Sequence, residues 1–388
     1  MIWRNVLGSL REKNSNFNSD FTEDQLQDPR LILSESEQMS LSQILNHFKN
    51  LQELILPTVA NTVLLESIAK SMPNLKLLDI SCSTNVTDYG ITSLVTPDVS
   101  QCHKLEQLFL DGTSITTDGV LILLVKLPLL ETVESSLLER ALDMVPVEKN
   151  TSGLNLRKIT VGRFWRGSEV LQNLPDLCPK LCQIILPNLG NDECYLLQKF
   201  QKLPSLVHVY IGQVKFENLL PVLPYFGQQL KTFSYSNFTE TVNLTPFIDA
   251  CHNLECLGIN AGSVNFLNFN EKIFSSLNLS ELRLNIHALI PQLVWSQFLV
   301  QCPNLLYLDI TPAENLNDNT LNSILQLNQD ILSRLRSFVV RGRHCGGDVA
   351  LTEKTVENLI KRCLNIKCIG DCSTWSVQPE NICEFIRF

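Results

Sequence analysis

Cysteines are the residues of this chain whose spacing most resembles a chemical site. The sequence of 388 residues contains 13 of them, and two pairs have the spacing C-x-x-x-C, Cys178 with Cys182 and Cys368 with Cys372. Closely spaced thiolates supply half of a tetrahedral zinc site. Neither pair has a second pair beside it at ligand spacing, so we expect structural cysteines, no metal and no cofactor.

Catalytic motifs are absent from the sequence. It has no G-x-x-x-x-G-K-[ST], G-x-S-x-G or H-E-x-x-H segment, and its six histidines are scattered. A nucleophilic Cys–His pair would have to be assembled in space rather than in sequence. We therefore predict that the chain is not an enzyme.

Two arginine-containing loops stand out in an acidic protein, GRFWRG at 162–167 and RGRHCGG at 341–347. Arginine forks flanked by glycine can bind carboxylates or phosphates bidentately. The alternative is that these are solvated loop charges. The candidate binding residues in the two loops are Arg163, Trp165, Arg166, Arg341 and Arg343.

The pattern L-x-x-L-x-L organises the rest of the chain. Most of its starts are 24–26 residues apart, three intervals are 30 or 31, and the copies at Leu130 and Ile366 lack the last apolar residue. This is close to the period of leucine-rich repeats. The pattern starts at Leu51, Leu75, Leu105, Leu130, Leu156, Leu181, Leu206, Leu230, Leu254, Leu279, Leu305, Leu335 and Ile366.

Each repeat reads as a short strand followed by a helix, as in LKLLDISCSTNVTDYGITSLV at 75–95. Thr87 and Asp88 are expected to cap the helix that follows them. Parallel strands joined by helical crossovers predict an α/β solenoid, a horseshoe of about 13 repeats with a concave parallel sheet and convex helices. Helices are expected around 64–72, 121–127, 194–200 and 355–363.

Five cysteines occupy one position of this repeat, three residues before the first apolar residue. A small hydrophobe at the end of each helix explains them without a metal. They are Cys102, Cys178, Cys251, Cys302 and Cys363.

The length, net charge and hydropathy of the chain indicate its domain organisation and its location in the cell. We expect one repeat domain over 51–372, an N-terminal capping segment at 1–50 and a C-terminal cap at 373–388. A net charge of -9 and a pI near 5.3 argue against nucleic acid as a partner. The chain has no apolar run of membrane-spanning length and no signal-peptide pattern, so we predict no membrane association and a cytoplasmic or nuclear location.

The third and fifth residues of each repeat should point away from the apolar anchors, because side chains alternate along a strand. Several of these outward residues are large, and large aromatic side chains there resemble the anchors of protein interfaces. The alternative is lateral packing on neighbouring strands. The candidates for binding a protein partner are Phe109, Ile185, His208, Tyr210 and Tyr307.

The order strand, Cys, Val-Thr-Asp-x-Gly, helix, Cys-x-x-Leu resembles the cysteine-containing repeats of F-box/leucine-rich-repeat proteins, most closely over 75–125. The resemblance implies substrate recognition for a cullin-based ubiquitin ligase through the concave face, with a ligase adaptor subunit as a further partner. Residues 1–50 contain Trp3 but no Leu-Pro start, so they read either as an F-box remnant or as a degenerate capping repeat at Leu31 and Leu33. The alternative function is a ligase-independent scaffold or inhibitor.

Overall fold

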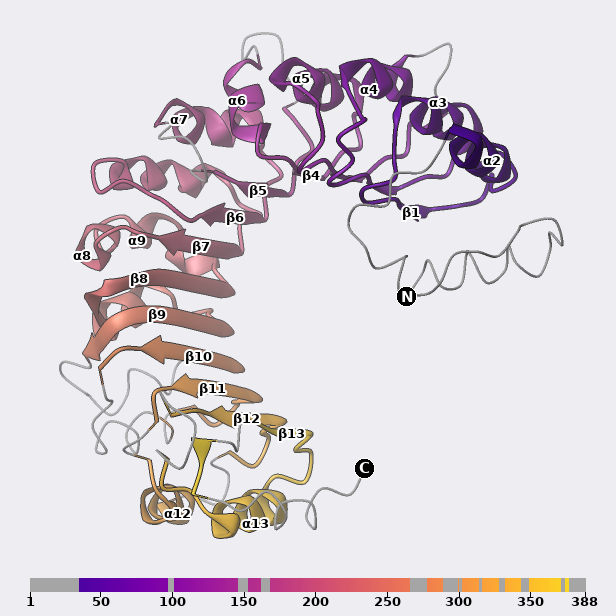
Figure 1. Cartoon of the computed structure of the whole chain (residues 1–388). Coiled ribbons are helices and arrows are strands. Elements are labelled where there is room, and N and C mark those ends of the chain that lie inside the picture. Colours follow the sequence, from indigo (N-terminus) through magenta and orange to yellow (C-terminus); the bar gives the residue numbers. More distant parts are fainter. Residues whose placement is uncertain are drawn as a thin grey trace, which may run out of the picture. The chain divides into compact units, whose positions relative to one another are not determined.

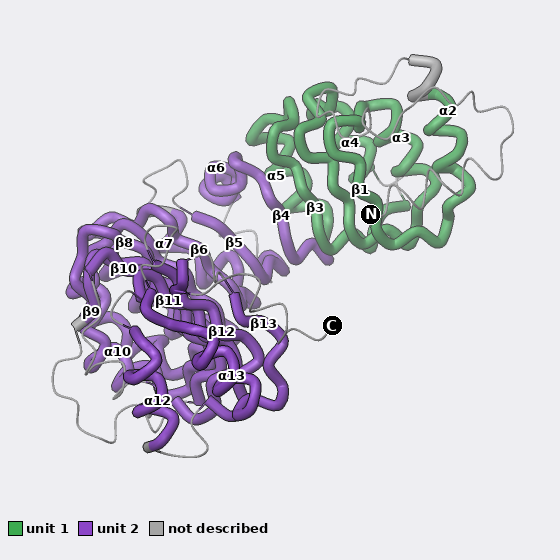
Figure 2. The backbone as a smooth tube through the Cα atoms, turned by 60° about the horizontal axis from the view of Figure 1, so that its bottom comes forward, with its two compact units in different colours: residues 1–127 green, residues 128–388 purple. Residues whose placement is uncertain are grey.

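The computed structural model describes residues 35–96, 101–145, 153–161, 168–265, 278–288, 299, 302–313, 316–327, 332–342, 349–370 and 374–376. The chain divides into two compact units, Met1–Leu127 (unit 1) and Pro128–Phe388 (unit 2), coloured separately in Figure 2. Residues 1–34 of the expected N-terminal cap, and most of the expected C-terminal cap at 373–388, lie outside the described residues.

Strands and helices alternate in unit 1, with the helices along one side and the strands along the other (Figure 1). The described elements of unit 1 are α2 (Glu35–Leu45), β1 (Glu53–Ile55), α3 (Thr62–Ser71), β2 (Leu77–Asp79), α4 (Asp88–Val95), β3 (Gln107–Phe109) and α5 (Thr117–Lys126).

The same alternation continues in unit 2 with more varied helices. The elements up to β8 are β4 (Thr132–Glu134), α6 (Leu138–Asp143), β5 (Lys158–Thr160), α7 (Ser168–Leu177), β6 (Gln183–Leu186), η3 (Cys194–Lys202), β7 (His208–Gly212), α8 (Phe216–Leu219), α9 (Leu223–Phe226), η4 (Gly227–Gln229) and β8 (Thr232–Asn243). They are followed by α10 (Leu244–Ala250), β9 (Cys256–Asn265), β10 (Glu281–Ile286), β11 (Tyr307–Thr311), α12 (Asp318–Leu327), β12 (Ser337–Val340), α13 (Glu353–Arg362) and β13 (Cys368–Gly370).

The strands confirm the predicted register. Each of the thirteen described strands begins at the third residue of a repeat, and the strands follow one another in chain order. Their pairings are parallel, for example Leu78 with Leu108 in unit 1 and Leu257 with Leu282 in unit 2. These four anchors are buried, because they face the helices that carry the chain from one strand to the next. The fold is therefore a leucine-rich-repeat solenoid of the α/β class.

The predicted helices are confirmed with one difference in type. Segments 64–72, 121–127 and 355–363 fall on α3, α5 and α13, whereas 194–200 falls on η3, a 3₁₀ helix. Helix α3 is closed at its start by Asn61, whose side chain accepts a hydrogen bond from the Leu64 amide at 2.9 Å. The buried side of α3 includes Leu65 and Ile68.

The chain leaves the strand side through a left-handed residue at a fixed repeat position. The eighth residue has positive φ at Thr58, Cys82, Gly112 and Gln213. Only Gly112 avoids the cost that a side chain has in this conformation. A Cβ at Gly112 would also be crowded, because it would lie 3.1 Å from Cys82 Cα.

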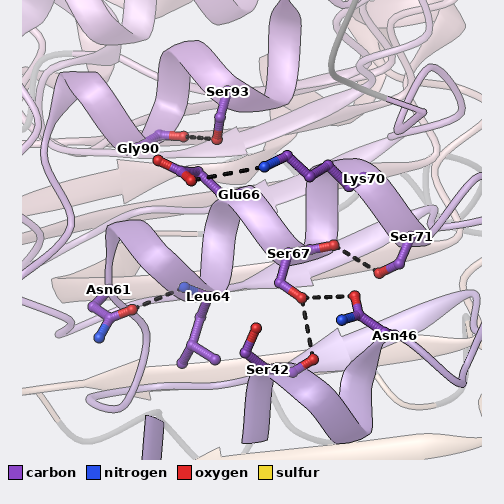
Figure 3. A network of polar contacts seen from close by, with 10 residues as sticks. All are labelled: Ser42, Asn46, Asn61, Leu64, Glu66, Ser67, Lys70, Ser71, Gly90 and Ser93. Atoms are coloured by element: carbon purple, nitrogen blue, oxygen red, sulfur yellow. Dashed lines mark hydrogen bonds and ion pairs between the residues drawn. The ribbon is translucent and has the colours of Figure 1, made fainter. Parts of the chain in front are cut away.

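Helix α2 packs on α3 through polar groups as well as apolar ones (Figure 3). The Ser67 hydroxyl lies 2.9 Å from Asn46 Oδ1 and 3.2 Å from the Ser42 carbonyl oxygen. Ser71 donates to the Ser67 carbonyl at 2.7 Å, which adds a further bond along α3. Ser67 and Ser71 are buried, so these bonds satisfy hydroxyls that have lost their water.

Aspartates at the helix starts connect repeats instead of capping their own helices. Thr87, the N-cap of α4, makes no capping hydrogen bond through its side chain. Asp88 accepts from the amide of Thr116 in the next repeat, at 2.8 Å, and from its hydroxyl. In unit 2, Asp318 likewise accepts from the Thr352 amide at 2.9 Å and from its hydroxyl. The capping prediction for Asp88 is therefore wrong, and the carboxylate joins adjacent repeats.

Replacing Asp318 by alanine should destabilise unit 2 by about 1–2 kcal/mol, because the N-cap region of α13 loses its acceptor. Burial alone would raise the pKa of Asp318, but hydrogen bonds from Thr352 and Thr355 lower it below the usual value. The stabilisation is therefore complete above the unfolded-state pKa and is lost as the pH falls through the folded-state pKa. In urea unfolding, the parent and Asp318→Ala should differ in the free energy of unfolding by a constant amount near neutral pH. The two values should converge below about pH 4.

The exposed neighbour on the same helix is the control for this prediction. Asn319→Ala removes a polar side chain from the first turn of α12 and leaves the Asp318–Thr352 hydrogen bonds in place. It should therefore leave the midpoint of urea unfolding nearly unchanged. Equal stability of Asp318→Ala and Asn319→Ala would show that the carboxylate does not join the two repeats.

The strands β8 and β9 are longer than the sequence pattern predicts. They remain paired beyond the repeat register, from Thr241 with Ser263 to Asn243 with Asn265, after a bulge in β8. Within the bulge Phe238 is exposed, and its ring stacks on His287 with the centroids 5.1 Å apart. The alternating β-formers of FSYSNFTETV at 233–242 are the signal for this extension.

Candidate protein-binding surface

The strand face of unit 2 is formed by the third and fifth residues of its repeats, which point away from the helices. Ile185 on β6 is the register partner of Tyr210 on β7. His208 lies two residues before Tyr210 on the same strand, so both side chains are on the same side of the sheet. The structure thus brings Ile185, His208 and Tyr210 together.

Tyr307 is a separate anchor on β11, four strands beyond β7. At about 4.8 Å per strand, the backbones of β7 and β11 are roughly 19 Å apart. Tyr307 is 43% exposed, whereas Ile185, His208 and Tyr210 are half-buried. Phe109 is half-buried on β3 of unit 1 and is not part of the unit 2 strand face.

Small side chains occupy the strand face on β8 and β9, whereas Glu281 and Arg283 on β10 lie between them and Tyr307. The outward positions are Thr232 and Ser234 on β8 and Cys256 and Gly258 on β9. Gly258 has no side chain, and the Ser234 hydroxyl lies beside it, 2.9 Å from the position that a Cβ would take. A partner can therefore approach the main chain closely between Tyr210 and the strands that follow.

Two arginines on or next to the strands that follow β9 are paired with carboxylates. Arg283 lies 2.5 Å from Glu281 on β10, and Arg341, directly after β12, lies 2.6 Å from Asp309 on β11. The prediction treated Arg341 as a loop cation available to a ligand. In the structure the guanidinium is paired with the Asp309 carboxylate and remains partly exposed, so its binding role stays a prediction. Arg163, Trp165, Arg166 and Arg343 lie outside the described residues, and their binding role stays a prediction.

The repeat cysteines are buried, as their position predicts. Burial raises the pKa of the Cys178, Cys251 and Cys302 thiols to about 12 and that of Cys363 to about 11. Thiols with such values are protonated near neutral pH and do not act as nucleophiles or ready metal ligands. The Cys363 Sγ instead lies 3.0 Å from the Leu332 carbonyl oxygen, in the preceding repeat.

Cys256 on β9 is a half-buried thiol on the strand face. Burial, followed by the nearby Glu281 carboxylate, raises the pKa of Cys256. Within the part of the chain that the structure describes, no group of three or more His, Cys, Asp and Glu side chains is arranged to hold a metal ion. The described strand face offers packing and hydrogen-bonding groups to a partner.

Known proteins give fold-level similarity only. No family model and no curated protein matches the chain. The structure of the Rad7 and Elc1 complex in yeast is similar with a TM-score of 0.47 and 13% identity, over 90% of this chain and 79% of that chain. The structure of the TLR13–ssRNA13 complex is similar with a TM-score of 0.38 and 14% identity, over 82% of this chain and 54% of that chain. At these values the function has to be argued from this chain's own surfaces.

Sequence reasoning missed a row of charges at the second residue of the repeats. These residues pair across neighbouring strands: Lys76 with Glu106 at 2.8 Å in unit 1, and in unit 2 Arg157 with Glu131 and Lys231 with Glu255, both at 3.0 Å. We call this row the second-position ladder. Comparing the second residues of successive repeats in the sequence would have revealed it.

The described helices contain no segment long and apolar enough to cross a membrane.

Proposed function

We propose that the chain is a protein-binding module that holds a protein partner on the strand face of unit 2. The observation that carries this proposal is the exposure of Tyr307, a large aromatic side chain on the strand side, where it serves no core. Together with Tyr210 it gives a partner two aromatic rings to contact, with the small residues of β8 and β9 beside Tyr210 and the Glu281–Arg283 pair beside Tyr307. Half-burial of Tyr210 leaves part of its ring for such contact.

The finer proposal is that the bound protein is a substrate of a cullin-based ubiquitin ligase. It is supported by the resemblance of the 75–125 repeats to F-box/leucine-rich-repeat proteins. A second candidate is a ligase-independent scaffold or inhibitor that uses the same strand face. It is supported by the exposure of Tyr307 itself, which offers a protein contact without any ligase subunit.

Affinity purification of the tagged full chain from cells separates the two candidates. Parent protein is compared with Tyr210→Ala/Tyr307→Ala after mild cross-linking, and the recovered proteins are quantified by mass spectrometry. A substrate receptor should recover cullin and adaptor subunits with both proteins, but the substrate only with the parent. Recovery of a tyrosine-dependent partner without cullin would support the scaffold. Recovery of the same proteins in equal amounts by both would contradict binding through the strand face.

A further inference from the structure

The second-position ladder ends in two neighbouring cations. Arg336 precedes β12 and Lys367 precedes β13, and the Lys367 amide donates to the Arg336 carbonyl at 2.7 Å. Continuing the register of Ser337 with Cys368 back by one residue places the two side chains at adjacent positions. Elsewhere on the ladder the paired neighbours have opposite charges. Like charges at adjacent strand positions are unfavourable. Glu106 and Glu131 also follow one another in repeat order, but each of those carboxylates is paired with a cation.

Neither cation is neutralised by the described residues. Arg336 and Lys367 are exposed, and no described carboxylate lies within ion-pair distance of either. Arg334, also exposed, adds a third cation and donates to the neutral Asn304 Oδ1 at 2.9 Å. The nearby Lys361, by contrast, is paired with a carboxylate. We call Arg334, Arg336 and Lys367 the basic strip.

An exposed leucine lies beside the basic strip. Leu364, in the turn before β13, is 88% exposed. It stands directly after the repeat cysteine, where four other repeats have His103, Pro179, His252 and Pro303. Extending the same register places Leu364 level with Ser333, next to Arg334. Cations and one apolar side chain therefore occur together on a chain whose net charge is -9.

We propose that the basic strip binds an acidic segment of the protein partner, with carboxylates on Arg334, Arg336 and Lys367 and an apolar residue of the segment against Leu364. This inference rests on the proposed function and names the chemistry of the partner. The two guanidinium groups suit carboxylates because they present paired donors in a fixed plane. The concentration of positive charge on an acidic molecule would also orient an acidic segment toward this end of unit 2.

Fluorescence anisotropy with a synthetic peptide tests the proposal on the full chain. The probe is a labelled peptide of repeating Glu-Glu-Leu, compared with the same peptide carrying Gln in place of Glu. The parent should bind the acidic peptide and bind the Gln peptide at least tenfold more weakly. Arg336→Gln/Lys367→Gln should lower the affinity for the acidic peptide roughly tenfold at low salt. This difference from the parent should fade as the salt concentration rises.

The matched control removes two cations from the same ladder at paired positions. Arg157→Gln/Lys231→Gln makes the same change in net charge but takes away cations that already have carboxylate partners. The control variant should bind the acidic peptide with an affinity within about twofold of the parent's. Leu364→Ser should lower the affinity for the acidic peptide and leave that for the Gln peptide unchanged. Equal losses for the strip and control variants would overturn the proposal, because net charge would then explain binding. Tighter binding of a single-stranded oligonucleotide than of the acidic peptide would overturn it too.

Two different experiments report on the acidic-segment proposal and on the proposed strand-face function. The tyrosine variants report on capture of a folded partner by the strand face, whereas the peptide reports only on the basic strip. Loss of partner capture by Tyr210→Ala/Tyr307→Ala, with peptide binding unaffected by the strip variant, would keep the strand-face function and remove only the acidic segment.

Discussion

Leu257→Asp is expected to unfold the centre of unit 2. Leu257 is buried in β9, between its register partners Phe233 on β8 and Leu282 on β10, all three of them core residues. An aspartate there would place a carboxylate among apolar side chains without a hydrogen-bond partner, at a cost on the order of several kcal/mol. Because each repeat is stabilised mainly by its neighbours, β8 and β10 should lose structure with β9.

Circular dichroism during thermal and urea unfolding measures this effect. The control is Leu257→Met, which conserves volume and polarity and should cost less than about 1.5 kcal/mol. A parental melting curve for Leu257→Asp would mean that residue 257 faces solvent and that the register of the strands is wrong.

Removing both strand-face tyrosines is expected to reduce partner binding far more than stability. Tyr210→Ala and Tyr307→Ala delete side chains that point away from the apolar anchors, Val209 and Leu308 being the buried residues beside them. Truncating an aromatic anchor at an interface costs roughly 2 kcal/mol or more, about thirtyfold in affinity. Quantitative pull-down of the partner by the double variant should therefore recover little of it, while the melting temperature stays near that of the parent.

Two tyrosines on the helix side of the same unit provide the matched control. Tyr195 on η3 and Tyr225 on α9 are exposed to a degree similar to Tyr307. Tyr195→Ala/Tyr225→Ala removes the same chemical groups from the other side and should leave capture unchanged. The reverse result, with capture lost only in the helix-side variant, would move the interface to the helices.

The strand register was predictable because it follows from one repeated constraint. A leucine at the wrong position of a strand would face solvent, so the pattern recurs along the chain, incomplete only in the repeats that start at Leu130 and Ile366. The buried positions of Cys178 and Cys302 follow from the same constraint. The outward direction of Tyr210 and Tyr307 required nothing more than alternation along the strand.

Other features depend on contacts between repeats, which the period alone does not encode. Asp88 looks like a helix cap in its own repeat, yet its hydrogen bonds go to Thr116 in the next one. Arg341 looks like a loop cation until the sheet places it beside Asp309, 32 positions earlier in the chain. The basic strip is visible only when second residues of neighbouring repeats are compared, since Arg336 and Lys367 are far apart in sequence.

Site-specific photo-cross-linking tests most directly whether the strand face of unit 2 is the protein-binding surface. A benzoylphenylalanine would replace Tyr307 on the strand side or, in a second protein, Tyr225 on the helix side, where the side chains are exposed to similar degrees. After irradiation in cells, we expect a covalent adduct with the captured partner from position 307 and none from position 225. Adducts from position 225 alone would contradict binding through the strand face.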